Sequence, residues 1–149
     1  MYRLIILSEL ILLFFSSCIT DKDCTGDSYA LAVGVDSSFN DRRKRSKERM
    51  NPYELYLFIQ RGFEQDTIDI FINDKFYIQR ICSTDPSMEL CTGEIILDSL
   101  EDVSSVSFRM NCGPKVSVNL DRSLGNIITL DYREDTLKAT LMKYPNIYE

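Results

Sequence analysis

The chain has 149 residues, of which 44% are hydrophobic and 27% charged, and its net charge is −6. This size suits one small domain behind a processed N-terminal segment. The chain contains no His, which excludes Ser–His and Cys–His catalytic arrangements and imidazole metal ligands within it. An acidic chain does not favour the wrapping of a phosphate backbone, so we expect no nucleic-acid partner.

The first 17 residues have the pattern of a secretory signal peptide. Arg3 precedes an apolar stretch over residues 4–15, and two serines follow it. Twelve helical residues span roughly 18 Å, well short of the ~30 Å hydrocarbon core of a bilayer. Glu9 also interrupts the apolar stretch. We therefore expect residues 1–17 to be a signal peptide rather than a stable transmembrane helix.

The four residues that end this segment carry a resemblance to a known class of protein. Phe15, Ser16, Ser17 and Cys18 are similar to the lipobox of bacterial lipoproteins, although Phe stands where Leu is usual. The resemblance implies that Cys18 becomes the lipid-modified first residue, with palmitate-type chains that hold the protein on a membrane. Ile19 lacks the aspartate linked to inner-membrane retention, so the resemblance implies the outer membrane, on either face. The alternative is a conventional cleavage near Ser17 that leaves Cys18 as a thiol.

Residues 18–50 are predicted to be a lipid-anchored polar and basic tether. Only residues 29–35 (YALAVGV) are apolar, and they are either a first strand or an apolar patch of the linker. The run RRKRSKER over residues 42–49 holds six basic residues and one acidic residue. We expect it to contact an anionic lipid or saccharide surface. The candidate contact residues are Arg42, Arg43, Lys44, Arg45, Lys47 and Arg49.

The tether also contains a partial calcium-loop pattern. Asp21, Asp23, Thr25 and Gly26 match the start of such a loop. The twelfth position is Ala32, where the loop needs a bidentate Glu. We therefore predict no metal site, and no residue pattern predicts a cofactor.

Beyond residue 50 the hydrophobic pattern has the period of two that is typical of strands half-buried in a sheet. In residues 105–112, for example, Val106, Phe108 and Met110 share one face. We predict an all-β fold over residues 51–149, an antiparallel β-sandwich of about seven to nine strands, immunoglobulin-like or similar. The predicted strands cover residues 53–60, 66–73, 76–82, 93–100, 105–112, 115–121, 126–132 and 136–142.

Four cysteines remain once Cys18 is assigned to lipid, and an even number in an exported chain indicates two disulfides that staple the domain. Cys82 and Cys91 flank a short polar loop, so a local bridge between them is easy to form. That pairing leaves Cys24 with Cys112, and we prefer this arrangement. The rival contains a Cys82–Cys112 bridge inside the core.

Two further sets of residues have functional interpretations. Acidic clusters at strand ends could form a paired-carboxylate hydrolase site, but turns are rich in Asp for local hydrogen-bonding reasons. Aromatic residues crowd the first three predicted strands, and they are either packed inside a sandwich or part of an interaction surface. The acidic residues are Asp98, Glu101, Asp102, Asp131, Glu134 and Asp135; the aromatic ones are Tyr53, Tyr56, Phe58, Phe71, Phe76 and Tyr77.

These observations favour an exported, membrane-anchored lipoprotein that binds a protein or saccharide in the cell envelope and is not an enzyme. One alternative is a lipid-anchored inhibitor or immunity protein against a periplasmic or extracellular enzyme. A small hydrolase that uses the acidic turns is the second alternative.

Overall fold

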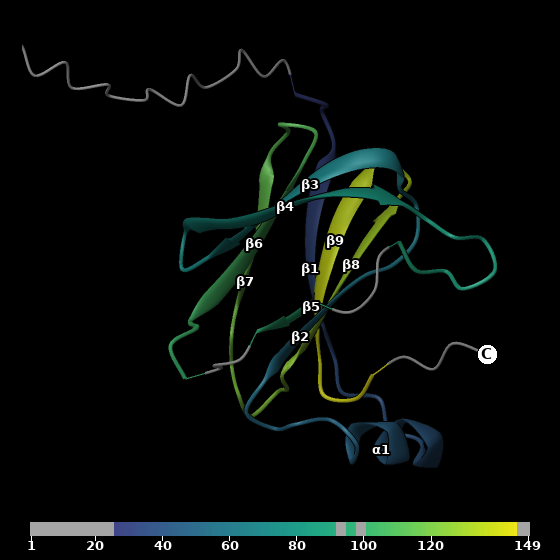
Figure 1. The fold of residues 1–149 in the computed structure, drawn as a ribbon, viewed down its shortest axis with the longest axis vertical. Coiled ribbons are helices and arrows are strands. Elements are labelled where there is room, and N and C mark those ends of the chain that lie inside the picture. Colours follow the sequence, from purple (N-terminus) through teal and green to yellow (C-terminus); the bar gives the residue numbers. More distant parts are fainter. Residues whose placement is uncertain (1–25, 92–94, 98–100, 146–149) are drawn as a thin grey trace, which may run out of the picture.

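The computed structural model describes residues 26–91, 95–97 and 101–145. Within these ranges nine strands pair into a five-stranded sheet of order β1-β9-β8-β2-β5 and a four-stranded sheet of order β4-β3-β6-β7 (Figure 1). The prediction of an all-β sandwich is confirmed at the level of two packed sheets. The bounds are β1 Ala30–Asp36, α1 Asp41–Lys47, β2 Leu55–Ile59, β3 Glu64–Ile72, β4 Lys75–Ser83, β5 Ile95–Leu97, β6 Ser105–Met110, β7 Lys115–Asn119, β8 Ile127–Arg133 and β9 Thr136–Met142.

Alternating apolar residues explain why these segments form strands and how the sheets face each other. On β6, the side chains of Val106, Phe108 and Met110 are buried between the sheets. Neighbouring strands contribute residues of the same phase, and both sheets supply members of one hydrophobic core. Strands β2 to β9 correspond to the eight predicted segments, and β5 is described only over three residues.

The expectation of a wholly antiparallel sandwich is wrong for two strand pairs. Strand β1 pairs parallel with β9, and β2 pairs parallel with β8. The remaining pairings between named strands are antiparallel. Period-two alternation is the same in both kinds of ladder, so the pattern of one strand does not report the direction of its neighbour.

The structure also places part of the predicted tether inside the domain. Residues 30–36 form β1, which is hydrogen-bonded along the edge of the five-stranded sheet, and residues 41–47 form α1. The domain therefore begins well before the predicted boundary at residue 51. Helix α1 starts at Asn40, whose side chain accepts a hydrogen bond from the Arg43 backbone N–H at 2.8 Å.

A second, smaller apolar cluster lies on the outer face of the five-stranded sheet. Tyr56, Ile127 and Met142 are buried there, and Met50 and Phe58 pack against them. Met50 belongs to the segment between α1 and β2, so this segment covers one end of the outer face. The cluster explains why β2 is apolar on both faces, as expected for a central strand.

Candidate binding site at the basic end

The two ends of the sandwich differ in the residues that they carry. At one end, which we call the cysteine end, lie the β6–β7 turn with Cys112, the end of β4 with Cys82, and the start of β1. Asp66 links the first two of these parts, because it pairs in register with Cys82 and accepts a hydrogen bond from the Asn111 side chain at 2.6 Å. The opposite end, which we call the basic end, carries α1, the β7–β8 loop and the last residues of β9 (Figure 1).

The start of β1 is fixed to the cysteine end by one buried side chain. The Tyr29 hydroxyl donates to the backbone oxygen of Met110 at 3.0 Å or to that of Pro114 at 2.7 Å, and it accepts from the Met110 N–H at 2.9 Å. The ring packs edge-on against Tyr132 with centroids 6.2 Å apart. Burial raises the pKa of the Tyr29 hydroxyl above its usual range.

At the basic end, α1 is held in place by the Arg43 side chain, which is only 8% exposed. Its guanidinium donates to the backbone oxygens of Pro145 and Tyr144, both at 2.9 Å, and to Ser38. It also forms an ion pair with Asp36 at 3.1 Å. Arg43 therefore connects the helix to the ends of β1 and β9. From the sequence alone it is expected to contact an external anionic surface, but its side chain is buried.

The other residues of the predicted basic surface lie differently from Arg43. Arg42, Lys44, Arg45 and Arg49 are exposed on or just after α1. Lys47 is partly buried, and its ammonium donates to the Asn126 side-chain oxygen. Burial lowers the pKa of the Lys47 ammonium.

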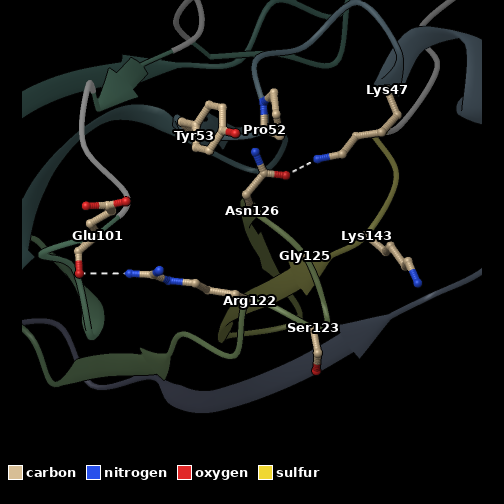
Figure 2. Close-up of a pocket in the computed structure, with 9 residues that line it drawn as sticks. All are labelled: Lys47, Pro52, Tyr53, Glu101, Arg122, Ser123, Gly125, Asn126 and Lys143. Carbon is tan, nitrogen blue, oxygen red and sulfur yellow. Dashed lines mark hydrogen bonds between the residues drawn. The ribbon is translucent and has the colours of Figure 1, made fainter.

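A pocket of about 340 Å³ opens beside Lys47 at this end of the molecule (Figure 2). Three cationic side chains line it: Lys47 from α1, Arg122 from the β7–β8 loop and Lys143 after β9. Glu101 contributes the one carboxylate of the lining, and Tyr53 lies at the rim with 71% of its surface exposed. The pocket thus gathers positive charge on a chain whose net charge is −6.

Hydrogen bonds to fixed polar groups position two of these cations. The Asn126 side chain is 5% exposed; its amide donates to the Glu54 backbone oxygen at 2.7 Å and its oxygen accepts from Lys47. The Arg122 guanidinium donates to the Glu101 backbone oxygen at 2.8 Å. Lys143, by contrast, makes no hydrogen bond or ion pair with its side chain among the described residues, and it extends away from Arg122 in Figure 2.

The wall between Arg122 and Asn126 requires glycine. Gly125 has φ of +143°, a conformation that side-chain-bearing residues rarely adopt. A Cβ at this position would lie 2.0 Å from the Met142 backbone oxygen. The close approach of these two segments brings the β7–β8 loop next to Lys143.

In one of the predicted acidic clusters, Asp131 and Asp135 interact with different partners. Asp131 lies 3.6 Å from the Arg61 guanidinium, and burial raises its pKa. Asp135 instead accepts a hydrogen bond from the Tyr132 hydroxyl. Tyr132 follows Asp131 on β8, so its side chain lies on the opposite face of the sheet. Glu134 and Asp135 have positive φ angles of 48° and 54°, as expected for the tight β8–β9 turn. Asp98 lies outside the described residues.

The aromatic residues that were expected to crowd the first three strands divide into packed and exposed groups. Tyr56 and Phe58 belong to the small cluster under the α1–β2 segment. Phe71 and Phe76 pair edge-on at 5.9 Å on β3 and β4. Phe76 and Tyr77 are exposed on β4, and Tyr53 is exposed at the pocket rim.

The described cysteines, Cys82, Cys91 and Cys112, lie at the cysteine end. Cys82 and Cys91 are free, and their side chains are hydrogen-bonded to each other. Burial raises the pKa of the Cys82 thiol well above its usual range. Cys112 is not one of the free cysteines. Cys18, Cys24 and the calcium-like residues Asp21, Asp23 and Thr25 lie outside the described residues.

Among the described residues that line the pocket, Glu101 supplies the one carboxylate. The described part of the chain contains no cluster of three or more His, Cys, Asp or Glu residues arranged to hold a metal ion. Within the same ranges, no helix is both long enough and apolar enough to cross a bilayer.

Sequence reasoning identified Lys47 in this region but missed the pocket. Lys47 lies far from Arg122, Asn126 and Lys143 in the sequence, and no sequence pattern links these three residues to it. Comparison with known proteins finds no matching family model, no similar curated protein and no similar solved structure.

Proposed function

We propose that this protein is an exported lipoprotein, anchored through Cys18, whose sandwich binds an envelope component at its basic end and does no catalysis. The observation that carries the proposal is the separation of the two ends. The described chain begins at Gly26 beside the β6–β7 turn, whereas α1 lies at the other end (Figure 1). Helix α1 contributes Lys47 to the pocket. A protein anchored near Gly26 presents its pocket away from its own membrane.

Distances along the chain allow this orientation. Seven residues separate Cys18 from Gly26, and the eight Cα-to-Cα steps between them reach at most about 28 Å when fully extended. Strand β1 adds seven residues, or roughly 20 Å, between the cysteine end and the basic end. That length exceeds the Debye length of about 8 Å at physiological ionic strength. The basic end therefore has little electrostatic contact with the anchoring bilayer when the domain stands upright.

Two disulfides at the cysteine end would strengthen this arrangement. A Cβ built on Gly26 would lie 2.1 Å from the Cys112 backbone oxygen, so the chain passes directly over Cys112 two residues after Cys24. We propose a Cys24–Cys112 bond on this ground, because disulfide-linked Cα atoms lie about 4.4–6.8 Å apart. The contact between Cys82 and Cys91 supports the second bond. The first bond would leave only the five residues between Cys18 and Cys24 to connect the anchor to the domain.

The anchor is tested by metabolic labelling with an alkyne fatty acid in the native host. Wild-type protein should incorporate the label and fractionate with the outer membrane. Cys18→Ser should lose both properties, while Ser17→Ala, which keeps a small residue before the cysteine, should retain them. Unlabelled wild-type protein in the soluble fraction would contradict the proposal.

Binding is tested by incubating the full-length protein, reconstituted in zwitterionic nanodiscs, with purified envelope material of the host. Wild-type protein should sediment with this material. Lys143→Glu, at the pocket, should reduce sedimentation, and Lys75→Glu, an equal charge change on exposed β4, should not. Absence of wild-type binding, or equal loss in both variants, would contradict a binding role for the basic end.

A further inference from the structure

We propose that the pocket at the basic end binds a saccharide that carries carboxylate groups. The inference rests on the proposed binding function and adds the chemical class of the ligand. It draws on the charge of the lining, the exposed ring at the rim and the shape of the site.

The charge of the lining calls for an anionic ligand. Lys47, Arg122 and Lys143 bring three cations to one pocket, against the single carboxylate of Glu101. Hydrogen bonds between cationic donors and a carboxylate are stronger than those between neutral groups. The Lys143 ammonium has no partner among the described residues, so a ligand that binds it displaces no existing ion pair.

The rim supplies the kind of surface that a sugar ring covers. Tyr53 is 71% exposed and stands beside Pro52, so an apolar ring and a flat pyrrolidine border the pocket. Figure 2 shows both residues on the side of the pocket opposite Arg122 and Ser123. A pyranose placed between them can cover Tyr53 with its C–H face. Its hydroxyl and carboxylate groups then face Asn126 and the cationic side chains.

The shape of the site disfavours a peptide or a folded protein as the ligand. About 340 Å³ lies at the small end of the range for small-molecule sites, roughly 300–1,000 Å³. Loops and α1 form the lining, and residues of the exposed sheet-edge strands are absent from it, so an acidic peptide would find no strand edge to extend. A short segment of an anionic polysaccharide fits both the volume and the open mouth.

The experiment uses full-length protein in zwitterionic nanodiscs and isothermal titration with three probes: tetragalacturonate, the neutral maltotetraose and the acidic peptide tetraglutamate. Tetragalacturonate should bind, and the other two should bind at least about tenfold more weakly, because each lacks one of the two features recognised. Raising the salt concentration should weaken tetragalacturonate binding. Equal binding of maltotetraose or tetraglutamate, or no binding of tetragalacturonate, would overturn the inference.

Variants assign the binding to this pocket. Lys143→Glu should weaken tetragalacturonate binding about tenfold, since it replaces an attractive contact with a repulsive one. Lys75→Glu should leave it unchanged. Tyr53→Ala should weaken tetragalacturonate binding, whereas Tyr53→Phe, which keeps the ring, should bind as wild type does. Tyr77→Ala, at an exposed tyrosine on β4, should have no effect. Equal weakening by the paired controls would place the binding elsewhere and overturn the inference.

The failure of this inference is distinguishable from the failure of the proposed function. If envelope material binds and is released by Lys143→Glu while tetragalacturonate does not bind, the pocket has a ligand of another class. If neither binds, the binding role of the basic end is contradicted as well.

Discussion

The cysteine end and the basic end of the sandwich are fixed by different kinds of interaction. At the cysteine end, the Tyr29 ring packs in the core and its hydroxyl bonds to the β6–β7 turn. At the basic end, long polar side chains reach backbone oxygens instead: Arg43 binds Pro145 and Tyr144, and Asn126 binds Glu54. One end is thus a closed continuation of the core, and the other is a polar scaffold around an open pocket.

This difference shows how a small acidic domain can leave cationic side chains exposed at one end. Buried polar side chains at the basic end satisfy the backbone, so Lys143 and the exposed residues of α1 are not needed for structure. The hydrophobic core lies between the two sheets, away from these side chains. Substitutions at the two ends should therefore have separable effects on stability and on binding.

The largest expected effect on stability is at Tyr29. Tyr29→Ala removes a core aromatic ring and should lower the free energy of unfolding by about 3–5 kcal/mol. Tyr29→Phe keeps the ring and should cost about 1–2 kcal/mol, because the Met110 backbone groups lose a buried partner. Tyr53→Ala, at the exposed rim, should change stability by less than about 0.5 kcal/mol. Urea unfolding followed by circular dichroism measures all three, and equal effects at both tyrosines would contradict the distinction between the ends.

The next largest effect concerns the thiol pair of the cysteine end. A Cys82–Cys91 bond closes a short loop and should contribute roughly 2–3 kcal/mol to the free energy of unfolding. In the Cys24→Ala/Cys112→Ala background, a reductant should therefore lower stability by that amount. Adding Cys82→Ala and Cys91→Ala should remove the dependence on reductant. Alkylation of both thiols before reduction, detected by intact mass, would show that the bond is absent.

At the basic end, Arg43→Met should lower the free energy of unfolding by about 2 kcal/mol. The substitution keeps the apolar stem but leaves the carbonyls of Tyr144 and Pro145 without their donor. Amide hydrogen exchange should accelerate in α1 and remain slow in β6. Lys44→Met, on the exposed face of the same helix, provides the control and should change neither quantity. Slow exchange in α1 of Arg43→Met would contradict the role assigned to Arg43.

The smallest effect is a pH dependence at Asp36. Burial acts to raise the pKa of this carboxyl, but hydrogen bonds from Ser38 and the Arg43 guanidinium outweigh it, so the pKa lies below 3.8. The folded state therefore gains stability above that value and loses it as the pH falls through the lowered pKa. Asp36→Asn should be less stable than wild type near neutrality, and the difference should shrink towards about pH 2. Urea midpoints measure it, and a difference that does not depend on pH would contradict the assignment.

The strands were predictable because apolar and polar residues alternate within each short segment. On β6, for example, Val106, Phe108 and Met110 are buried apolar residues at alternate positions. The parallel partners of β1 and β2 were not predictable, because each strand pairs with residues that are 106 positions away for β1 and 71 positions away for β2. Helix α1 escaped prediction since its charged residues show no apolar stripe, although Asn40 and Asp41 form a recognisable start. The pocket was missed for the same reason as the parallel pairs: Lys47, Arg122 and Lys143 meet only in the folded chain.

The orientation of the two ends relative to the membrane is the central claim, and the absence of Trp from the chain allows a direct measurement. Single-Trp variants at Ser28, near the cysteine end, and at Tyr53, at the basic end, would be extracted from the native host with their lipid anchor and reconstituted into vesicles with a dansyl-labelled headgroup. Energy transfer falls with the sixth power of distance. Ser28→Trp should transfer efficiently and Tyr53→Trp weakly. Equal transfer from both, or stronger transfer from Tyr53→Trp, would contradict the account.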